Sequence, residues 1–371
     1  MKLSEYSKLL SVTLFLAVLT GTVSGQTNWP SYRGNQGLSG FTPVNITSKP
    51  KLAWSFKAGS GIKSSPVIGD GQIFTGSDDG TLYCLTKEGK QIWTFRAESA
   101  FEAPPLYYSQ SLYAGSLDGI MYALDAKTGK MRWKFTTEGQ IASAPNFYMN
   151  VNSRKVIFGS YDYSLYSVDD ATGKQDWKYT SGNYVNCTPT VTGTNAVFGG
   201  CDGYLHFVNP ASGVLIKKIE TGSYVAASSV LSGGQVFLGN YDGEFFSIDF
   251  AKEKPVWTNT GGGSFVASPA VSGNMIVAAS ANRLVYCYDK STGKTIWTYR
   301  TNGKNSGSPV IAGESVLFTS EDGKIYLLDL KNGALKWSFD LGSPSVSTPA
   351  VVTGLIVVTT TDGHIFGFSF N

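Results

Sequence analysis

Short apolar runs alternate with turn residues along most of the chain, and residues 307–346 show this arrangement most clearly. Apolar runs cover residues 309–311, 315–319 and 324–330, and a fourth run surrounds Trp337. The separators supply residues that tolerate positive φ, as tight hairpins require. They are Ala312-Gly313-Glu314, Asp322-Gly323 and Asn332-Gly333. The pattern predicts a four-stranded antiparallel unit.

The same unit repeats along the chain. The Asp-Gly turn recurs every 39 to 44 residues, and a Trp recurs in the expected fourth strands. The turn positions are Asp79, Asp118, Asp162, Asp202, Asp242, Asn282, Asp322 and Asp362; the Trp positions are Trp54, Trp93, Trp133, Trp177, Trp257, Trp297 and Trp337, with Lys217 as the exception. A stacked β-solenoid has shorter coils without hairpin turns at this spacing. Eight such units predict an all-β, eight-bladed β-propeller.

The two ends of the repeat complement each other. Residues 52–56 resemble a fourth strand with no first three before it, whereas residues 349–371 supply three strands and stop. We expect the N-terminal strand to close the last blade, which removes free sheet edges. This gives one propeller domain over residues 52–371, preceded by a polar lead at 26–51 that crosses one face or edge of the ring.

Residues 1–25 have the pattern of a secretory signal peptide. Lys2 and Lys8 accompany an apolar run over residues 9–18, and small residues follow at 23–25. No cysteine lies near the cleavage point to accept a lipid, and no later segment is apolar enough to span a bilayer. We therefore expect an exported protein, periplasmic or extracellular.

Composition narrows the range of partners. The net charge is only +3 and no basic run stands out, which argues against nucleic acid or anionic lipid. The 21 Phe, 20 Tyr and 8 Trp residues are expected mainly to fill the cores between blades.

The four cysteines fall into two groups. Cys84 and Cys287 occupy equivalent repeat positions and are expected to be buried free thiols. Cys187 and Cys201 flank a hairpin whose turn is residues 192–195, so either a disulfide within the fourth blade or two reduced residues is consistent with the sequence.

No motif for catalysis or metal binding is present. HExxH, GxSxG, a P-loop and Cys/His metal spacings are all missing from the sequence. His206 occupies an aromatic core position, and His364 a position expected on a solvated face. The repeated Asp residues suit Asx-capped turns better than a metal ring, because each falls in a separate blade. We assign no catalytic residue and no metal ligand.

Two places are physically sensible for binding. One is the mouth of the central channel, where the connections between blades vary from repeat to repeat. The candidates there are Lys63, Phe101, Glu102, Tyr184, Asn186, Tyr224, Phe265, Lys304 and Asn305. The other is the outer rim around Lys217 and Lys218, where the recurring Trp is missing.

The repeat resembles the pyrroloquinoline-quinone (PQQ)-type propeller repeat. Three stretches come nearest to the consensus of that repeat: Ser65–Trp93, Ala103–Trp133 and Ser308–Trp337. The consensus reads S-x-P-V-x-x-G-x-x-x-x-G-S-x-D-G-x-L-Y-x-L-D-x-x-T-G-K-x-x-W. Residues 29–34 also resemble the lead segment of exported members. The resemblance implies one of two roles. Some members are quinoprotein dehydrogenases that hold PQQ and Ca²⁺, and others are cofactor-free BamB-like scaffolds of outer-membrane assembly that bind a protein partner.

The scaffold branch fits the chain better. The dehydrogenases resemble one another in a vicinal Cys-Cys pair and long blade insertions, whereas here no two cysteines are adjacent and the blades are nearly uniform. We expect a monomeric, non-catalytic scaffold without cofactor that binds a protein of the cell envelope. The alternatives are a minimal PQQ/Ca-dependent quinoprotein dehydrogenase and a protein that binds glycans or cell-surface polymers.

Overall fold

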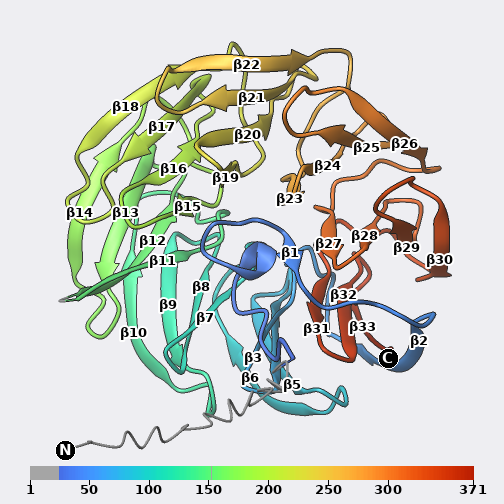
Figure 1. The fold of residues 1–371 in the computed structure, drawn as a ribbon. Helices are drawn as coiled ribbons and strands as arrows, with labels where there is room; N and C mark the ends of the chain where they lie inside the picture. The colour runs from blue at the N-terminus through green and yellow to red at the C-terminus, as the bar shows by residue number, and fades with distance from the viewer. Residues whose placement is uncertain (1–24, 152) are drawn as a thin grey trace, which may run out of the picture.

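The strands form eight sheets arranged as a ring around a central channel in the computed structural model, which describes residues 25–151 and 153–371 (Figure 1). Each sheet contains one four-stranded antiparallel blade whose first strand lies nearest the channel (Figure 1), and the sheet of blade seven carries the short strand β1 (Phe41–Thr42) as a fifth strand. The eight-bladed propeller expected from the repeat is therefore confirmed. Most of the expected signal peptide, residues 1–24, lies outside the described residues.

The blades follow the chain order with short strands and tight turns. Blades one to four are β3 (Val67–Gly69), β4 (Gln72–Gly76), β5 (Thr81–Thr86) and β6 (Gln91–Arg96); β7 (Leu106–Tyr108), β8 (Ser111–Gly115), β9 (Ile120–Asp125) and β10 (Met131–Thr136); β11 (Asn146–Asn150), β12 (Ser153–Gly159), β13 (Ser164–Asp169) and β14 (Gln175–Thr180); and β15 (Thr190–Val191), β16 (Ala196–Gly199), β17 (Tyr204–Val208) and β18 (Leu215–Glu220).

The remaining blades repeat the plan. Blades five to eight are β19 (Val230–Ser232), β20 (Gln235–Gly239), β21 (Phe245–Asp249) and β22 (Lys254–Asn259); β23 (Ala270–Ser272), β24 (Met275–Ala279), β25 (Leu284–Asp289) and β26 (Thr295–Arg300); β27 (Val310–Ala312), β28 (Ser315–Thr319), β29 (Lys324–Asp329) and β30 (Leu335–Asp340); and β31 (Ala350–Val352), β32 (Leu355–Thr359), β33 (His364–Ser369) and β2 (Lys51–Lys57).

The N-terminal strand β2 closes the ring, as the sequence predicts. It pairs antiparallel with β33 from Lys51↔Ser369 to Lys57↔His364, so the first and last strands of the propeller share one sheet. Trp54 on β2 donates its indole N–H to the Lys87 carbonyl of blade one at 2.7 Å, which fastens blade eight to blade one. Both ends of the chain thus contribute to closure.

The recurring Trp residues fasten each blade to the next. Six of the seven rings cover a glycine of the following blade, where an added Cβ would lie only 2.5–2.7 Å from the ring, whereas the Trp337 ring packs on Phe339 and on Phe368 of blade eight. These glycines have φ of +69° to +78°, so positive φ and close approach both require glycine there. The pairs are Trp54–Gly89, Trp93–Gly129, Trp133–Gly173, Trp177–Gly213, Trp257–Gly293 and Trp297–Gly333.

The junction of blades four and five differs in both partners. Lys217 replaces the Trp and donates to the Phe250 carbonyl at 2.7 Å, the bond that the indole N–H makes elsewhere. Glu253 replaces the glycine at φ +57° and pairs with the Lys217 ammonium at 3.0 Å. The Lys217 ammonium also lies 4.2 Å from the centre of the Phe250 ring. The two replacements therefore compensate each other.

This compensation predicts a strong coupling between positions 217 and 253. Lys217→Trp alone is expected to lower the free energy of unfolding by about 2 kcal/mol, because the indole would overlap the Cβ of Glu253. Adding Glu253→Gly should restore most of that loss, which gives a coupling energy of about 1–2 kcal/mol in a double-mutant cycle of urea denaturation. Additive effects of the two changes would contradict the compensation.

The lead segment lies across the central channel, with the short 3₁₀ helix η1 (Tyr32–Gly34) at its centre (Figure 1). Its strand β1 (Phe41–Thr42) pairs parallel with β27. Its main chain also hydrogen-bonds the first strands or first turns of blades one, two, four and six to eight. These bonds join Trp29 to Ile68, Pro30 to Tyr107, Gln36 to Val191, Ser39 to Val271, Gly40 to Ile311 and Gln26 to Thr353. The lead therefore closes one end of the channel, which we call the lead face.

Candidate functional site

The opposite end of the channel, which we call the mouth face, is formed by the connections between blades. A Pro, or Ser229 in blade five, directly precedes the first strand of each blade and opens the unit, and the residues three positions before it form a ring at this end. Lys63, Ala142, Asn186, Ala226, Val266, Ser306 and Val346 all line one cavity of about 160 Å³ in the channel. Glu102 completes the ring through an ion pair with Lys63, whose Nζ lies 2.5 Å from its Oε1.

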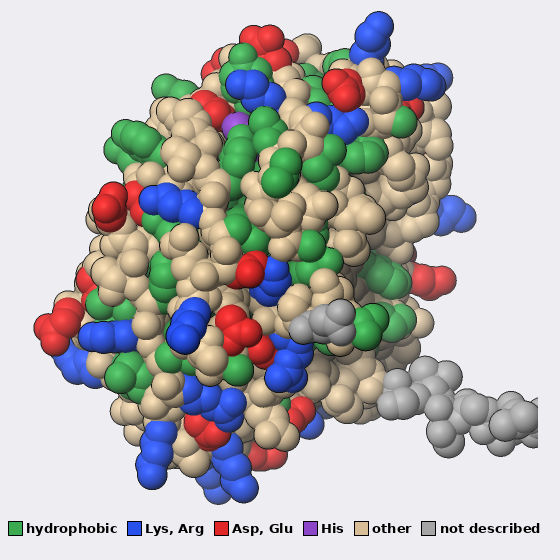
Figure 2. Space-filling model, turned by 90° about the vertical axis from the view of Figure 1, so that its left-hand side faces the viewer, with side chains coloured by type: hydrophobic (Ala, Val, Ile, Leu, Met, Phe, Trp, Pro, Cys, Tyr) green, Lys and Arg blue, Asp and Glu red, His purple; other side chains and the backbone are tan. Residues whose placement is uncertain are grey.

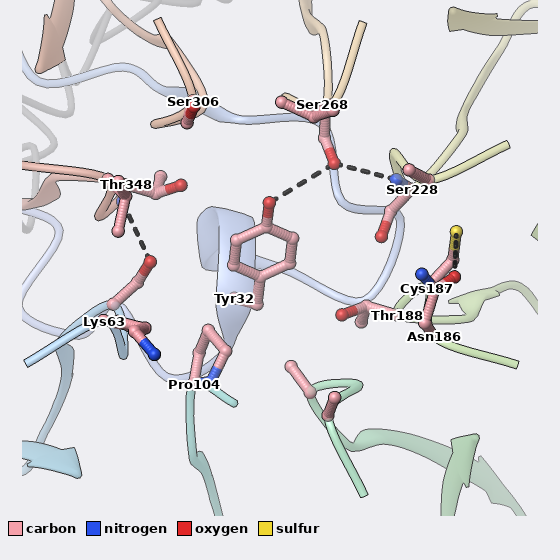
Figure 3. Close-up of a pocket in the computed structure, with 16 residues that line it drawn as sticks. Tyr32, Lys63, Pro104, Asn186, Cys187, Thr188, Ser228, Ser268, Ser306 and Thr348 are labelled. Atoms are coloured by element: carbon pink, nitrogen blue, oxygen red, sulfur yellow. Dashed lines mark hydrogen bonds between the residues drawn. The ribbon is translucent and has the colours of Figure 1, made fainter. Parts of the chain in front are cut away.

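Tyr32 of η1 forms the floor of this cavity (Figure 3). Its hydroxyl lies 2.8 Å from Ser308 Oγ and 3.3 Å from Ser268 Oγ, on two neighbouring blades. Lys63 is exposed, and Asn186 and Ser306 are half-buried, so solvent reaches the cavity from the mouth face. The channel is therefore a blind funnel rather than a pore.

The wall of the funnel combines small apolar residues with hydroxyl groups, and the sequence analysis missed a column of these hydroxyls. They come from the residue directly before the opening Pro, or before Ser229 in blade five, and six of the eight blades carry Ser or Thr there: Ser65, Thr188, Ser228, Ser268, Ser308 and Thr348. This column is readable from the aligned repeats. We passed over it because small hydroxyl residues beside Pro are also ordinary turn residues.

The other mouth candidates divide into exposed and buried residues. Tyr184, Tyr224 and Lys304 are exposed on the mouth face, as expected. Phe101 and Phe265, however, pack on Gly76 and Gly239 at the ends of second strands and belong to the blade cores.

Asn305 is also fully buried, and it accepts a hydrogen bond from the Thr301 hydroxyl at 3.1 Å. The expectation that Phe101, Phe265 and Asn305 lie at the mouth surface is therefore corrected. Each precedes the ring position by one residue, and this offset turns the side chain from the channel into the blade.

Two tyrosine clusters are exposed beside the funnel. In the first, the Tyr184 ring lies 4.7 Å from the Tyr161 ring and 5.3 Å from the Tyr163 ring. In the second, Tyr224 and Tyr241 are more than half exposed, with centroids 6.5 Å apart. Tyr184 and Tyr224 belong to successive connections between blades, so the clusters follow the rim of the mouth over blades three to five.

The cysteines and histidines have structural surroundings. Cys187 and Cys201 are both free thiols, and the ladder of β15 and β16 ends at Thr190↔Val197, before it reaches either cysteine. Burial raises the pKa of the Cys187 thiol, which donates to the Val225 carbonyl at 2.9 Å. Cys84 and Cys287 are buried and free, as expected.

His206 is buried in the aromatic position of its blade, as expected. Its ring stacks on Phe198 at 4.9 Å between centroids and bonds Asp202 and the Tyr179 hydroxyl. Burial lowers the pKa of His206. These contacts give it a packing role.

The two lysines of the outer rim, Lys217 and Lys218, contact neighbouring side chains. Lys217 is engaged by Glu253 and Phe250, and the Lys218 ammonium lies 4.4 Å from the centre of the Tyr204 ring. Figure 2 shows this side of the ring, where hydrophobic side chains lie among Lys, Arg, Asp and Glu. The mouth face is thus the better candidate site.

Comparison with known proteins agrees with the architecture. The model for the family described as outer membrane protein assembly factor BamB matches residues 24–142, 107–299 and 300–371. The chain belongs to this family. A search of curated protein sequences finds no significant match.

Solved structures with the same fold include members of both expected branches. BamB from Moraxella catarrhalis is 16% identical, with a TM-score of 0.75, and the match covers 87% of this chain and 98% of that one. Quinohemoprotein alcohol dehydrogenase from Comamonas testosteroni is 14% identical, with a TM-score of 0.79 and coverage of 92% and 80%. At these identities the likeness shows the fold alone.

The funnel does not fit PQQ with Ca²⁺. Among the residues that the structure describes, no group of three or more His, Cys, Asp or Glu side chains could hold a metal ion. The wall is lined with hydroxyls, whereas protein Ca²⁺ sites rely on carboxylates. The cavity of about 160 Å³ is also smaller than the roughly 300 Å³ at which pockets for larger organic ligands begin.

Proposed function

We propose that the chain is an exported, non-catalytic scaffold of the cell envelope that binds another protein through its mouth face. Membership of the BamB family supports a role in the assembly of outer membrane proteins. The N-terminal signal pattern supports export. Within residues 25–151 and 153–371, no helix has the length and hydrophobicity needed to cross a bilayer.

The observation that carries this proposal is the pair of exposed tyrosine clusters. Tyr rings combine a large apolar contact area with a hydroxyl that bonds to polar groups, and they are enriched at protein interfaces. Four of the five tyrosines are exposed on one face, beside connections that vary between blades. Such a surface suits a folded partner that covers several blades.

Site-specific photocrosslinking in the source cell tests this proposal. A photoreactive amino acid at position 184 or 224 is expected to capture the same envelope protein, because both positions lie on the proposed contact surface. The matched control carries the photoreactive amino acid in place of Met131, an exposed residue of outer strand β10, and should not capture the envelope protein. Equal capture at all three positions, or none at 184 and 224, would refute the assignment of the mouth face.

A further inference from the structure

The blind funnel has the size and surroundings of a site for a very small ligand. Its volume of about 160 Å³ is below the roughly 300 Å³ at which pockets for drug-sized ligands begin. It is open at the mouth face, and Tyr32 closes it below. Partial enclosure of this kind favours a compact polar ligand.

The hydroxyls of the wall are arranged as donors. The backbone N–H of Ser228 donates to Ser268 Oγ at 3.0 Å, and that of Thr348 donates to Ser65 Oγ at 2.8 Å. The Thr348 hydroxyl likewise accepts the N–H of Ser308 at 3.3 Å. A hydroxyl that already accepts a bond keeps its own proton to donate. The contacts between blades therefore leave these protons available to a ligand.

Several of these protons have no acceptor in the protein. The Ser65 and Thr348 hydroxyls donate to none of the described residues, and those of Thr188 and Ser228 make no hydrogen bond with any of them. Figure 3 shows Thr188, Ser228 and Thr348 around the Tyr32 ring, on different blades. The wall thus offers several hydrogen-bond donors around one small space.

A buried cation lies next to this ring of hydroxyls. Arg33 is fully buried and donates to the carbonyls of Pro309, at 2.6 Å, and Pro269, which directly follow Ser308 and Ser268. Among the residues that the structure describes, no carboxylate forms an ion pair with it, and its Nε–H has no hydrogen-bond partner. Burial lowers its pKa to about 10, so it remains charged at neutral pH. The Arg33 charge thus lies beside the blades that carry Ser268 and Ser308, where it favours an anion over a cation.

Three carboxylates lie near the mouth end of the funnel. Glu102 pairs with Lys63, and Asp78 lies near the same ammonium group. Glu321 accepts a hydrogen bond from the Ser306 hydroxyl at 2.5 Å. The other residues that line the cavity are uncharged. All three contact or lie near residues of the mouth ring, so an anion in the lower part of the funnel would meet the hydroxyl donors beside Tyr32 and Arg33.

We propose that the funnel is a binding site for a small oxyanion, held by the wall hydroxyls above Tyr32 and Arg33. Two sources supply this chemistry: a free ion such as sulfate or phosphate, and a carboxylate on an acidic side chain of a bound protein. The proposal does not depend on the scaffold function, because it rests on the funnel alone.

Titration of the purified protein with sodium sulfate, phosphate and acetate tests this site, with sodium chloride at equal ionic strength as the reference. At least one oxyanion is expected to raise the thermal midpoint above the chloride value and to bind with a millimolar Kd by calorimetry. Binding of sulfate or phosphate indicates a free ion. Binding of acetate and of a short Asp-containing peptide, but not its Asn counterpart, indicates a partner's carboxylate.

The double variant Thr188→Val/Ser228→Ala locates the binding. These hydroxyls support no contact within the protein, so the variant should fold normally while its Kd rises at least tenfold. Thr258→Val is the matched control, because Thr258 is an exposed residue on outer strand β22. It should leave the Kd unchanged. The proposal is overturned if no oxyanion binds beyond chloride, or if the double variant binds as tightly as the original protein.

Discussion

Replacing Arg33 by alanine is expected to lower the free energy of unfolding by about 3–5 kcal/mol, because the change leaves two buried carbonyls without a donor and empties the buried space that the Arg33 side chain fills. The carbonyls of Pro269 and Pro309 belong to neighbouring blades, so Arg33 joins these blades to the lead. Gly40 packs directly against the guanidinium, where an added Cβ would lie 2.0 Å from Nη2. Urea denaturation followed by tryptophan fluorescence measures the loss.

Two further variants separate the causes of this loss. Arg33→Met fills most of the space but donates no hydrogen bond to the two carbonyls. It should therefore recover the stability lost through the cavity, but not the stability lost through the unpaired carbonyls. Arg96→Ala is the control, because this arginine is largely exposed and its nearest carboxylate contact, with Asp79, is 4.0 Å long. It should change stability by less than about 0.5 kcal/mol. A similarly small effect of Arg33→Ala would show that the lead does not hold the ring.

The fold was predictable because each level of the pattern repeats. The Asp-Gly and Asn-Gly turns set the hairpins, and the recurring Trp placed the outer strands. The closing strand was predictable too, because residues 52–56 and the three C-terminal strands complete one blade. Because the same pattern occurs eight times, the assignment of strands is much less ambiguous than it would be for a single hairpin.

The site was predictable only in part. The ring positions Lys63, Glu102 and Asn186 were found because variation between otherwise uniform repeats indicates residues that packing does not determine. The burial of Phe101 and Phe265 was missed, since neighbouring residues of an extended segment point in opposite directions and the sequence does not fix which one faces the channel.

The role of the lead could not be derived from the pattern at all. Residues 26–50 have no periodicity, and their hydrogen bonds join them to segments as distant as Thr353. We expected only that the lead crosses a face or edge of the ring. That Tyr32 and Arg33 reach the channel depends on contacts across more than two hundred residues of chain, which local preferences do not specify.

Gly333→Ala is expected to destabilise the ring by about 2–4 kcal/mol, although it adds only one methyl group. Two effects add at this position. The backbone φ of +71° is unfavourable for alanine and costs roughly 1–2 kcal/mol. The new Cβ would also lie 2.7 Å from the Trp297 ring, and relief of that overlap costs about 1–3 kcal/mol. Thermal and urea denaturation measure the sum.

The chain provides a control that separates these two effects. Gly342 has nearly the same φ, +77°, but no atom lies within 4 Å of an added Cβ, so Gly342→Ala should show the backbone cost alone. The difference between the variants then measures the contact of the Trp ring with glycine. Equal losses would mean that the glycines serve only the turn. In that case Glu253 would be tolerated at φ +57° whatever residue lies opposite, and the pairing of Lys217 with Glu253 would need another cause.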